Sequence, residues 1–399
     1  MRGTRISAIL AAFLLATPLI AAQEGLRVGV LYTGDPYPGQ TPYVHMKVEA
    51  FLRVTPVQAS RNHYAGISSD DILRAIRIYM PRRYQDLVDT YDVLIISDAN
   101  VMSFESKHLK WFKQSVEEDG MGLAMFGGYE SYGGAAGEPD WGATPVGDVL
   151  PVTTDPGQYE DGKVTILDEE NRFMSSLPWR PDLTFLQNYA SNIVQLKPSA
   201  ELLASSRIHS TGYENPFYST WVFGEGRTFA MTGDWTPGGG WNFLRWEYLP
   251  DFATNLMLYC ADRPIPRDLE LVHTVRTLLE RLAYERMIVD SLIDFVERFG
   301  ANPDRILAIL NEFDEAKGEA SRFYLQQEFE SALDTAEGAL DILDRADKVS
   351  EQVKNEALFW VYLSEWLTVT ATLLVSGFLI WSLMIRRRLY RQVRSTRFR

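Results

Sequence analysis

Cysteine and histidine are scarce in this chain, and their scarcity excludes several kinds of site. The 399 residues include one cysteine, Cys260, and five histidines. A single thiol forms no internal disulfide and supplies none of the paired cysteine ligands of a zinc finger. Cys260 lies in a mostly apolar run, which is typical of a buried, inert thiol rather than a nucleophile. We therefore predict no metal site.

The sequence also lacks the complete glycine motifs that hold nucleotides. Gly127 and Gly128 follow an apolar run, but neither G-x-G-x-x-G nor G-K-[ST] is completed there. A tight turn between a strand and a helix explains the pair. Ser131 misses the G-x-S-x-G spacing of a hydrolase nucleophile. The sequence thus predicts no cofactor and no serine hydrolase.

Positive charge is sparse between the two ends of the chain. Removing Arg2, Arg5 and the seven arginines of residues 386–399 from the net charge of −14 leaves residues 23–365 at about −23. Contacts to phosphates need clusters of lysine and arginine, so we predict no nucleic-acid partner. An acidic surface of this kind favours solubility and also attracts cations and basic partners.

Two uncharged stretches at the ends are the longest apolar features. Arg2 and Arg5 precede an uncharged run and the small residues Ala21 and Ala22, the order of a secretory signal peptide over residues 1–22. An uncleaved anchor is the alternative. Residues 366–385 carry no charge and would form about 30 Å of helix, enough to cross a bilayer.

The charges beside residues 366–385 predict the orientation. The tail 386–399 has seven arginines and no acid, whereas Glu356 and Glu365 lie on the other side. The positive-inside rule places such a tail in the cytoplasm. We expect a single-pass cell-membrane protein that contacts membrane lipid through one transmembrane helix and carries an extracytoplasmic N-terminal domain.

Residues 23–262 alternate short apolar runs with amphipathic stretches. Nearly all-apolar strands separated by helices are typical of a parallel sheet that is buried on both faces. We therefore predict an α/β domain with a doubly wound, flavodoxin-like, mostly parallel sheet. The expected strands are 27–32, 92–97, 122–126, 163–167, 220–223 and 228–232, and the expected helices are 70–79, 106–118 and 250–260.

After Arg263-Pro264-Ile265-Pro266 the pattern becomes helical, so this segment is the predicted domain boundary. Apolar residues recur at helical spacing through residues 263–362, which predicts a helical stalk or a small helical bundle. Such a stalk is consistent with simple spacing, with homo-oligomerisation and with binding of a protein partner.

Ligands of doubly wound folds meet the loops at the carboxyl ends of the strands. Asp98, Glu130 and Asp234 each follow a predicted strand. Two of these carboxylates in one cleft would suit acid–base hydrolysis, whereas the alternative is that they cap and hold the loops. The candidate ligand-binding residues on these loops are Gly128, Tyr129, Glu130, Ser131, Trp141, Asp234, Trp235, Asn242 and Arg245.

Four motifs occur in order along the first domain. They are YDVLIISDAN (91–100), DGMGLAMFGGYESYGG (119–134), GATPVGDVLPV (142–152) and TGDWTPGGGWNFLRW (232–246). With these motifs, residues 26–262 resemble the class I glutamine amidotransferase-like proteins, in the branch related to the trehalose-utilisation ThuA-like proteins.

The resemblance implies the fold but not the activity. An active class I amidotransferase has a cysteine on the strand-to-helix turn and a histidine and a glutamate on a late loop. Here the turn reads Gly128-Tyr129-Glu130-Ser131, and the late loop reads Gly233 to Pro237 without histidine. We therefore expect a pseudoenzyme that does not hydrolyse glutamine and binds a ligand or a protein. The alternative is a membrane-anchored hydrolase, glycoside-directed, that uses the three strand-end carboxylates.

Overall fold

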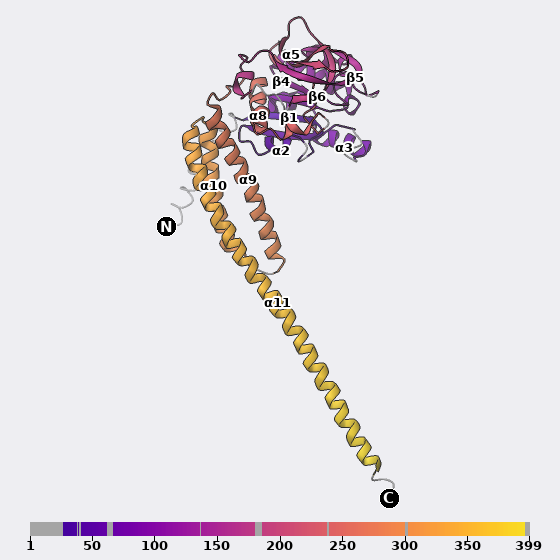
Figure 1. Cartoon of the computed structure of the whole chain (residues 1–399), viewed down its shortest axis with the longest axis vertical. Coiled ribbons are helices and arrows are strands. Elements are labelled where there is room, and N and C mark those ends of the chain that lie inside the picture. The colour runs from indigo at the N-terminus through magenta and orange to yellow at the C-terminus, as the bar shows by residue number, and fades with distance from the viewer. Residues whose placement is uncertain are drawn as a thin grey trace, which may run out of the picture. The chain divides into compact units, whose positions relative to one another are not determined.

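The computed structural model of the protein describes residues 27–37, 39, 41–61, 67–135, 137–179, 186–237, 239–299 and 302–395 (Figure 1). The predicted signal peptide, residues 1–22, lies outside the described residues. The chain divides into two compact units. The first unit comprises Met1–Glu280 and Glu319–Ala336, and the second comprises Arg281–Gly318 and Glu337–Arg399.

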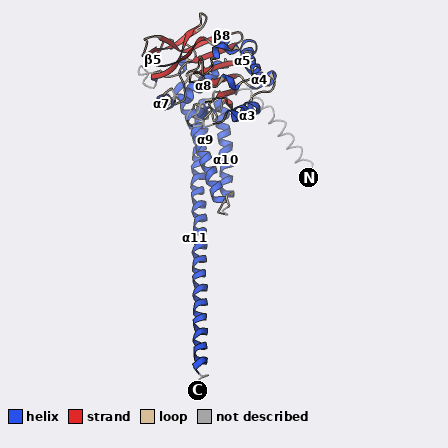
Figure 2. Cartoon of the chain, turned by 90° about the vertical axis from the view of Figure 1, so that its right-hand side faces the viewer, coloured by secondary structure: helices blue, strands red, loops and turns tan. Residues whose placement is uncertain are grey.

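One mixed sheet organises the first unit, and Figure 2 shows its strands together. The strand order is β2-β1-β3-β4-β9-β8-β7-β5-β6. The strands are β1 (Val28–Gly34), β2 (Leu52–Gln58), β3 (Val93–Ser97), β4 (Gly122–Phe126), β5 (Val152–Ile166), β6 (Gln187–Leu196), β7 (Glu201–Ile208), β8 (Glu214–Phe223) and β9 (Gly226–Met231).

Short helices connect and cover these strands. They are α2 (Tyr43–Met46), α3 (Ser69–Tyr79), α4 (Tyr84–Thr90), α5 (Ser106–Asp119), α6 (Pro145–Val149), α7 (Trp241–Leu244) and α8 (Leu249–Cys260). Single 3-10 turns lie at η2 (Val101–Ser103), η3 (Trp141–Ala143) and η4 (Met174–Ser176). The long helices are α9 (Leu269–Glu297), α10 (Asp304–Leu325) and α11 (Phe329–Ser395).

The strands β2, β1, β3, β4 and β9 pair in parallel. Every residue of β3 and β4 is buried, which explains their continuous apolar runs. Leu123 and Met125 of β4 pack into a core with Phe112 and Val116 of α5. The next residue along, Phe126, instead stacks on Trp235. The predicted α/β architecture of this part is confirmed.

The other four strands make the sheet mixed. Strands β8, β7, β5 and β6 are antiparallel to their neighbours. The connections explain the change: only Gly224 and Glu225 separate β8 from β9, and a chain this short returns antiparallel. The positive φ of Gly224, 60°, suits that tight turn.

In the second unit, the described residues of α9, α10 and α11 bury apolar stripes. The buried residues include Val289, Ile293 and Val296 of α9, Leu310 and Phe313 of α10, and Leu343 and Ala346 of α11. An ion pair of 2.8 Å joins Arg345 of α11 to Glu312 of α10.

The distal part of α11 has a different surface. Its large apolar side chains are exposed, for example Leu374 at 70% and Phe378 at 64%. Among the described residues, the helix span Phe329–Tyr390 is long and apolar enough to cross a membrane by length and composition. It contains the predicted transmembrane segment, residues 366–385.

Candidate functional site

The carboxyl ends of β1, β3, β4 and β9 lie at one edge of the parallel half, because these strands pair in parallel and in register. We call the loops that follow them the strand-end loops: residues 35–42, 98–105, 127–144 and 232–248. This edge is where ligands of open α/β sheets bind.

Asp98 holds the loop after β4. Its φ is 47°, a left-handed conformation that aspartate tolerates better than most residues, and its side chain is buried. One carboxylate oxygen, Oδ1, accepts a hydrogen bond of 2.7 Å from the backbone N–H of Glu130. A Cβ at Gly128, whose φ is 148°, would lie 2.4 Å from the same oxygen, so this position requires glycine.

Glu130 joins three loops through one buried carboxylate. It accepts hydrogen bonds from Ser60 Oγ at 2.6 Å, the backbone N–H of Arg61 at 2.7 Å and Asn100 Nδ2 at 2.7 Å. The residue is 2% exposed. Burial raises the pKa of Glu130 above its ordinary value, although the three hydrogen bonds oppose the shift. Its carboxylate is thereby committed to the fold.

Asp234 is the third buried carboxylate of this edge. It is 3% exposed and accepts hydrogen bonds from the backbone N–H and the hydroxyl of Thr236, at 2.7 and 2.6 Å. Burial raises the pKa of Asp234 to about 6, and the nearby negative charge of Asp35 adds to the shift. The two hydrogen bonds from Thr236 therefore make Asp234 the anchor of the tryptophan-rich loop.

The predicted ligand-binding residues divide into buried and exposed groups. Gly128, Ser131, Trp141 and Trp235 are buried. The two indoles serve the loops themselves: Trp141 Nε1 donates to the carbonyls of Ala99 and Glu130, and Trp235 Nε1 donates to Ser97 Oγ.

Three predicted residues remain accessible at this edge. Tyr129 is 44% exposed, and Asn242 and Arg245 are exposed as well. Trp241 is 49% exposed and has the guanidinium of Arg245 over its ring. A ligand at the strand-end loops would meet these side chains first.

Asn192 of β6 is a site residue that sequence reasoning missed. Its Oδ1 accepts from the backbone N–H of Gly128 at 2.9 Å, and its Nδ2 donates to the carbonyls of Gly128 and Ser131. It reaches the turn from a strand 64 residues further along the chain. No local motif marks such a contact, since it depends on where β6 packs.

Two buried polar atoms near these loops have no hydrogen-bond partner within the described part of the chain. They are Asp35 Oδ1 and the hydroxyl of Tyr159. Burial raises the pKa of Tyr159, and the carboxylates of Asp234 and Asp98 raise it further. The Tyr159 ring lies 5.3 Å from the ring of Tyr129. Buried polar atoms without partners are rare and often indicate a missing ligand or water.

The geometry does not favour the hydrolase alternative. Asp98, Glu130 and Asp234 are all buried, and each accepts a hydrogen bond from a loop backbone. Three of the described histidines are engaged elsewhere: His45 with Glu280, His273 with Asp251, and His108 in the cap of α5. The fourth, His209, is exposed beyond the end of β7. Residues 27–395, with their gaps, contain no group of three metal-binding side chains.

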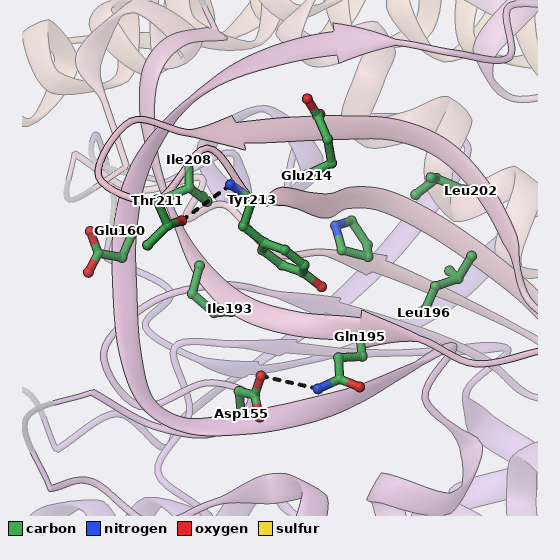
Figure 3. A pocket seen from close by; sticks show the side chains of 11 residues that line it. Asp155, Glu160, Ile193, Gln195, Leu196, Leu202, Ile208, Thr211, Tyr213 and Glu214 are labelled. Carbon is green, nitrogen blue, oxygen red and sulfur yellow. Dashed lines mark hydrogen bonds between the residues drawn. The ribbon is translucent and has the colours of Figure 1, made fainter.

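The structure also has a cavity away from the strand-end loops. It has a volume of about 580 Å³ and lies on the antiparallel half, between β5, β6, β7 and β8 (Figure 3). We call it the β5–β8 groove. Its lining residues are Asp155, Glu160, Ile193, Gln195, Leu196, Leu202, Ile208, Thr211, Tyr213, Glu214 and Pro216.

The solved structures that match this chain share little sequence identity with it. Cytoplasmic protein STM1381 of Salmonella typhimurium LT2 is 18% identical, with a TM-score of 0.46, over 58% of this chain and 99% of that one. Cytoplasmic protein STM3548 of Salmonella typhimurium is 17% identical, with a TM-score of 0.46, over 58% and 98%. A β-galactosidase of Rahnella sp. R3 is 12% identical, with a TM-score of 0.33, over 58% and 31%. All three TM-scores are below 0.5, so these likenesses support no argument.

No protein of curated function matches this chain. The family model described as "Putative glutamine amidotransferase" matches residues 79–261. The match lies within residues 26–262 and contains all four motifs of residues 91–246. It includes β3, β4 and the strand-end loops that follow both strands. This match shows the glutamine amidotransferase-like resemblance of residues 79–261.

Proposed function

We propose that this protein is a membrane-anchored, extracytoplasmic binding module, built on a glutamine amidotransferase-like domain that has lost the catalytic triad. The observation that carries the proposal is the state of Glu130. It occupies the turn where the family has its nucleophile, and its carboxylate is committed to hydrogen bonds from three donors of neighbouring loops.

The accessible groups at the strand-end loops favour recognition rather than catalysis. Tyr129, Trp241, Asn242 and Arg245 offer aromatic faces, an amide and a guanidinium. An aromatic face with a few polar groups is a common way to hold a small polar molecule. The unpaired Asp35 Oδ1 and Tyr159 hydroxyl would accept hydrogen bonds from hydroxyl or amino groups of such a ligand.

The anchoring part of the proposal rests on α11. Its distal segment exposes apolar side chains all round, a surface that suits lipid rather than water. The arginines from Arg386 onward would stay in the cytoplasm by the positive-inside rule, and the residues before the span would lie outside. We further propose that the parallel half, with the order β2-β1-β3-β4-β9, is flavodoxin-like and doubly wound.

A thermal-shift screen of the full chain in detergent tests the binding role. The panel holds sugars, amino acids, nucleotides and divalent metals. A ligand at a hundred times its dissociation constant should add about 2.7 kcal/mol to the free energy of unfolding. The double substitution Tyr129→Ala and Asn242→Ala should abolish the shift. Tyr79→Ala, which removes an exposed tyrosine of α3, should retain it.

Two results would overturn the proposal. One is the absence of any shift across the panel. The other is turnover of a panel compound by the wild type that is lost in Asp234→Asn, because that result would make the buried carboxylate catalytic.

A further inference from the structure

We infer that the β5–β8 groove binds a basic peptide segment of a partner protein, in which lysine or arginine side chains alternate with large apolar ones. This surface is separate from the strand-end loops. It was not predicted from the sequence, and it does not depend on the binding role proposed for those loops.

The groove exists because the antiparallel half curls. Strand β6 ends the sheet, yet it also contacts β8, which is three places away in the strand order. The hydroxyl of Tyr213, the residue before β8, donates to the Val194 carbonyl of β6 at 2.9 Å. Asn215 Oδ1 accepts from the Val194 N–H at 2.9 Å. These two side chains hold β6 against β8 and give the sheet its concave face.

The floor of the groove is apolar. Ile193 and Ile208 are 7% and 2% exposed, and Leu196 and Leu202 are half-buried beside them. Tyr213 remains 41% exposed, and Figure 3 shows its ring near the centre of the groove. Such a surface gains free energy when an apolar side chain covers it.

The rim is acidic on several sides. Figure 3 shows the carboxylates of Asp155, Glu160 and Glu214 around the Tyr213 ring. Asp155 accepts from the amide of Gln195, and Glu160 accepts from the hydroxyl of Ser210. Both of these donors are neutral. Arg207 lies 3.9 Å from Glu214, and none of the described residues that line the groove is a lysine, an arginine or a histidine.

Charge and size together identify the occupant. Of the three rim carboxylates, only Glu214 has a cation, Arg207, within 4 Å in the described part of the chain. Such a rim attracts a ligand with several positive charges. An apolar floor between them requires that the ligand also carry apolar groups. About 580 Å³ exceeds the volume of a single side chain, and the exposed residues Thr211, Tyr213 and Glu214 leave the groove open to solvent. A chain segment that enters and leaves the groove meets these conditions.

Fluorescence anisotropy with a labelled peptide tests the inference. The probe is a fluorescein-labelled nonapeptide of alternating leucine and lysine, titrated with the full chain in detergent. The triple substitution Asp155→Asn, Glu160→Gln and Glu214→Gln should weaken binding about tenfold, since partly exposed charge pairs each contribute a few-fold. The matched control Glu169→Gln, Glu170→Gln and Glu225→Gln removes the same charge from exposed positions elsewhere and should bind as the wild type.

Further probes separate the outcomes. A peptide with glutamate in place of lysine should not bind, and one with serine in place of leucine should bind at least tenfold more weakly. Equal weakening by the two triple substitutions, or equal affinity of the serine peptide, would overturn the inference, because charge alone would then explain binding. If the triple variant of the groove unfolds, the single substitution Glu214→Gln replaces it in the same titration, because Glu214 is exposed and its substitution should not disturb the fold. Tyr129→Ala with Asn242→Ala should bind the leucine–lysine peptide normally, which distinguishes this site from the strand-end loops.

Discussion

Buried carboxylates organise the strand-end loops, and each has a different set of donors. Asp98 accepts from a backbone N–H, Asp234 from a neighbouring threonine, and Glu130 from a hydroxyl, an amide and a backbone N–H. A buried acid with only neutral donors balances its desolvation against those hydrogen bonds. The balance between desolvation and hydrogen bonding differs among the three carboxylates, and the pH dependence of stability measures it.

Asp234 should make the protein more stable in mild acid. Its folded-state pKa of about 6 lies above the ordinary 3.8, so the folded state binds the proton more tightly than the unfolded state. The stability that this group contributes is full below about pH 4 and is lost as the pH rises through 6. Urea unfolding at pH 4.5 and 7.5 should show about 2 kcal/mol of pH dependence that Asp234→Asn lacks.

The control is Asp86→Asn, which removes a carboxyl from an exposed position of α4. This variant should keep the pH dependence of the wild type. Equal pH dependence in wild type and Asp234→Asn would contradict the raised pKa.

Glu130→Gln should destabilise the first unit by about 1–3 kcal/mol. The carboxylate accepts on both oxygens, whereas a glutamine amide presents its NH₂ either to the N–H of Arg61 or to the Nδ2 of Asn100. One buried donor is then left unpaired. Glu138→Gln is the control, because Glu138 is exposed and accepts from the same Asn100. Chemical denaturation of both variants checks the prediction, and equal losses would contradict it.

At the scale of elements, one buried ion cluster in the first unit joins α8, α9 and α10. Arg276 of α9 is 3% exposed and lies 2.9 Å from Glu49 and 2.9 Å from the Tyr324 hydroxyl, and it also pairs with Asp251. His273 lies 2.6 Å from the same Asp251. A cluster with these partners keeps two buried carboxylates compensated.

Arg276→Met should cost about 3–5 kcal/mol, because it leaves Glu49 and Asp251 without their cation. Cys260 reports the loss: it is 1% exposed, and burial raises the pKa of its thiol to about 12, so alkylation awaits unfolding. Alkylation rates in increasing urea give the free energy of unfolding. Arg281→Met removes an exposed arginine that pairs with Glu285 on the same helix, and it should cost less than about 1 kcal/mol. Similar costs for both substitutions would contradict a special role of the cluster.

At the scale of the whole molecule, the first compact unit includes more than the α/β sequence pattern. It takes in α9 as far as Glu280 and the segment Glu319–Ala336. Val272, Val275 and Leu279 of α9 are buried in it. The helical part of the sequence therefore contributes to the stability of the family domain.

A fragment of residues 23–262 should unfold about 5–10 °C below a fragment of residues 23–336. The shorter fragment lacks Arg276, Tyr324 and the buried face of α9, and each kcal/mol corresponds to a few degrees in a domain of this size. Differential scanning calorimetry of the two fragments measures the gap. Coincident melting temperatures would show that the α/β part is independent of the helices.

The proposed orientation predicts which side of the membrane each end occupies. A cysteine introduced at exposed Glu225 should react with an impermeant maleimide on intact cells, and one at Arg388 should react only after lysis. Buried Cys260 should remain silent in both cases. The opposite labelling pattern would reverse the proposed topology.

The sequence alone determined what depends on local pattern and composition. Continuous apolar runs specified β3 and β4, and the four motifs specified the amidotransferase-like match of residues 79–261. The uncharged run 366–385 lies within the one described helix able to cross a membrane. The turn after β4 could likewise be located, because a strand followed by paired glycines has few other conformations.

Only the tertiary structure decided the rest, because it depends on contacts between distant segments. The antiparallel half follows from which strands meet, and strands β6 and β7 had no distinctive periodicity. Asn192 bonds to the turn after β4 across 64 residues of sequence. Trp141 and Trp235 are buried in the packing of the loops. Arg276 pairs with Glu49 and Asp251. The β5–β8 groove depends on the curl of the sheet that Tyr213 and Asn215 stabilise. The curvature of a sheet cannot be predicted from the spacing of residues along the chain.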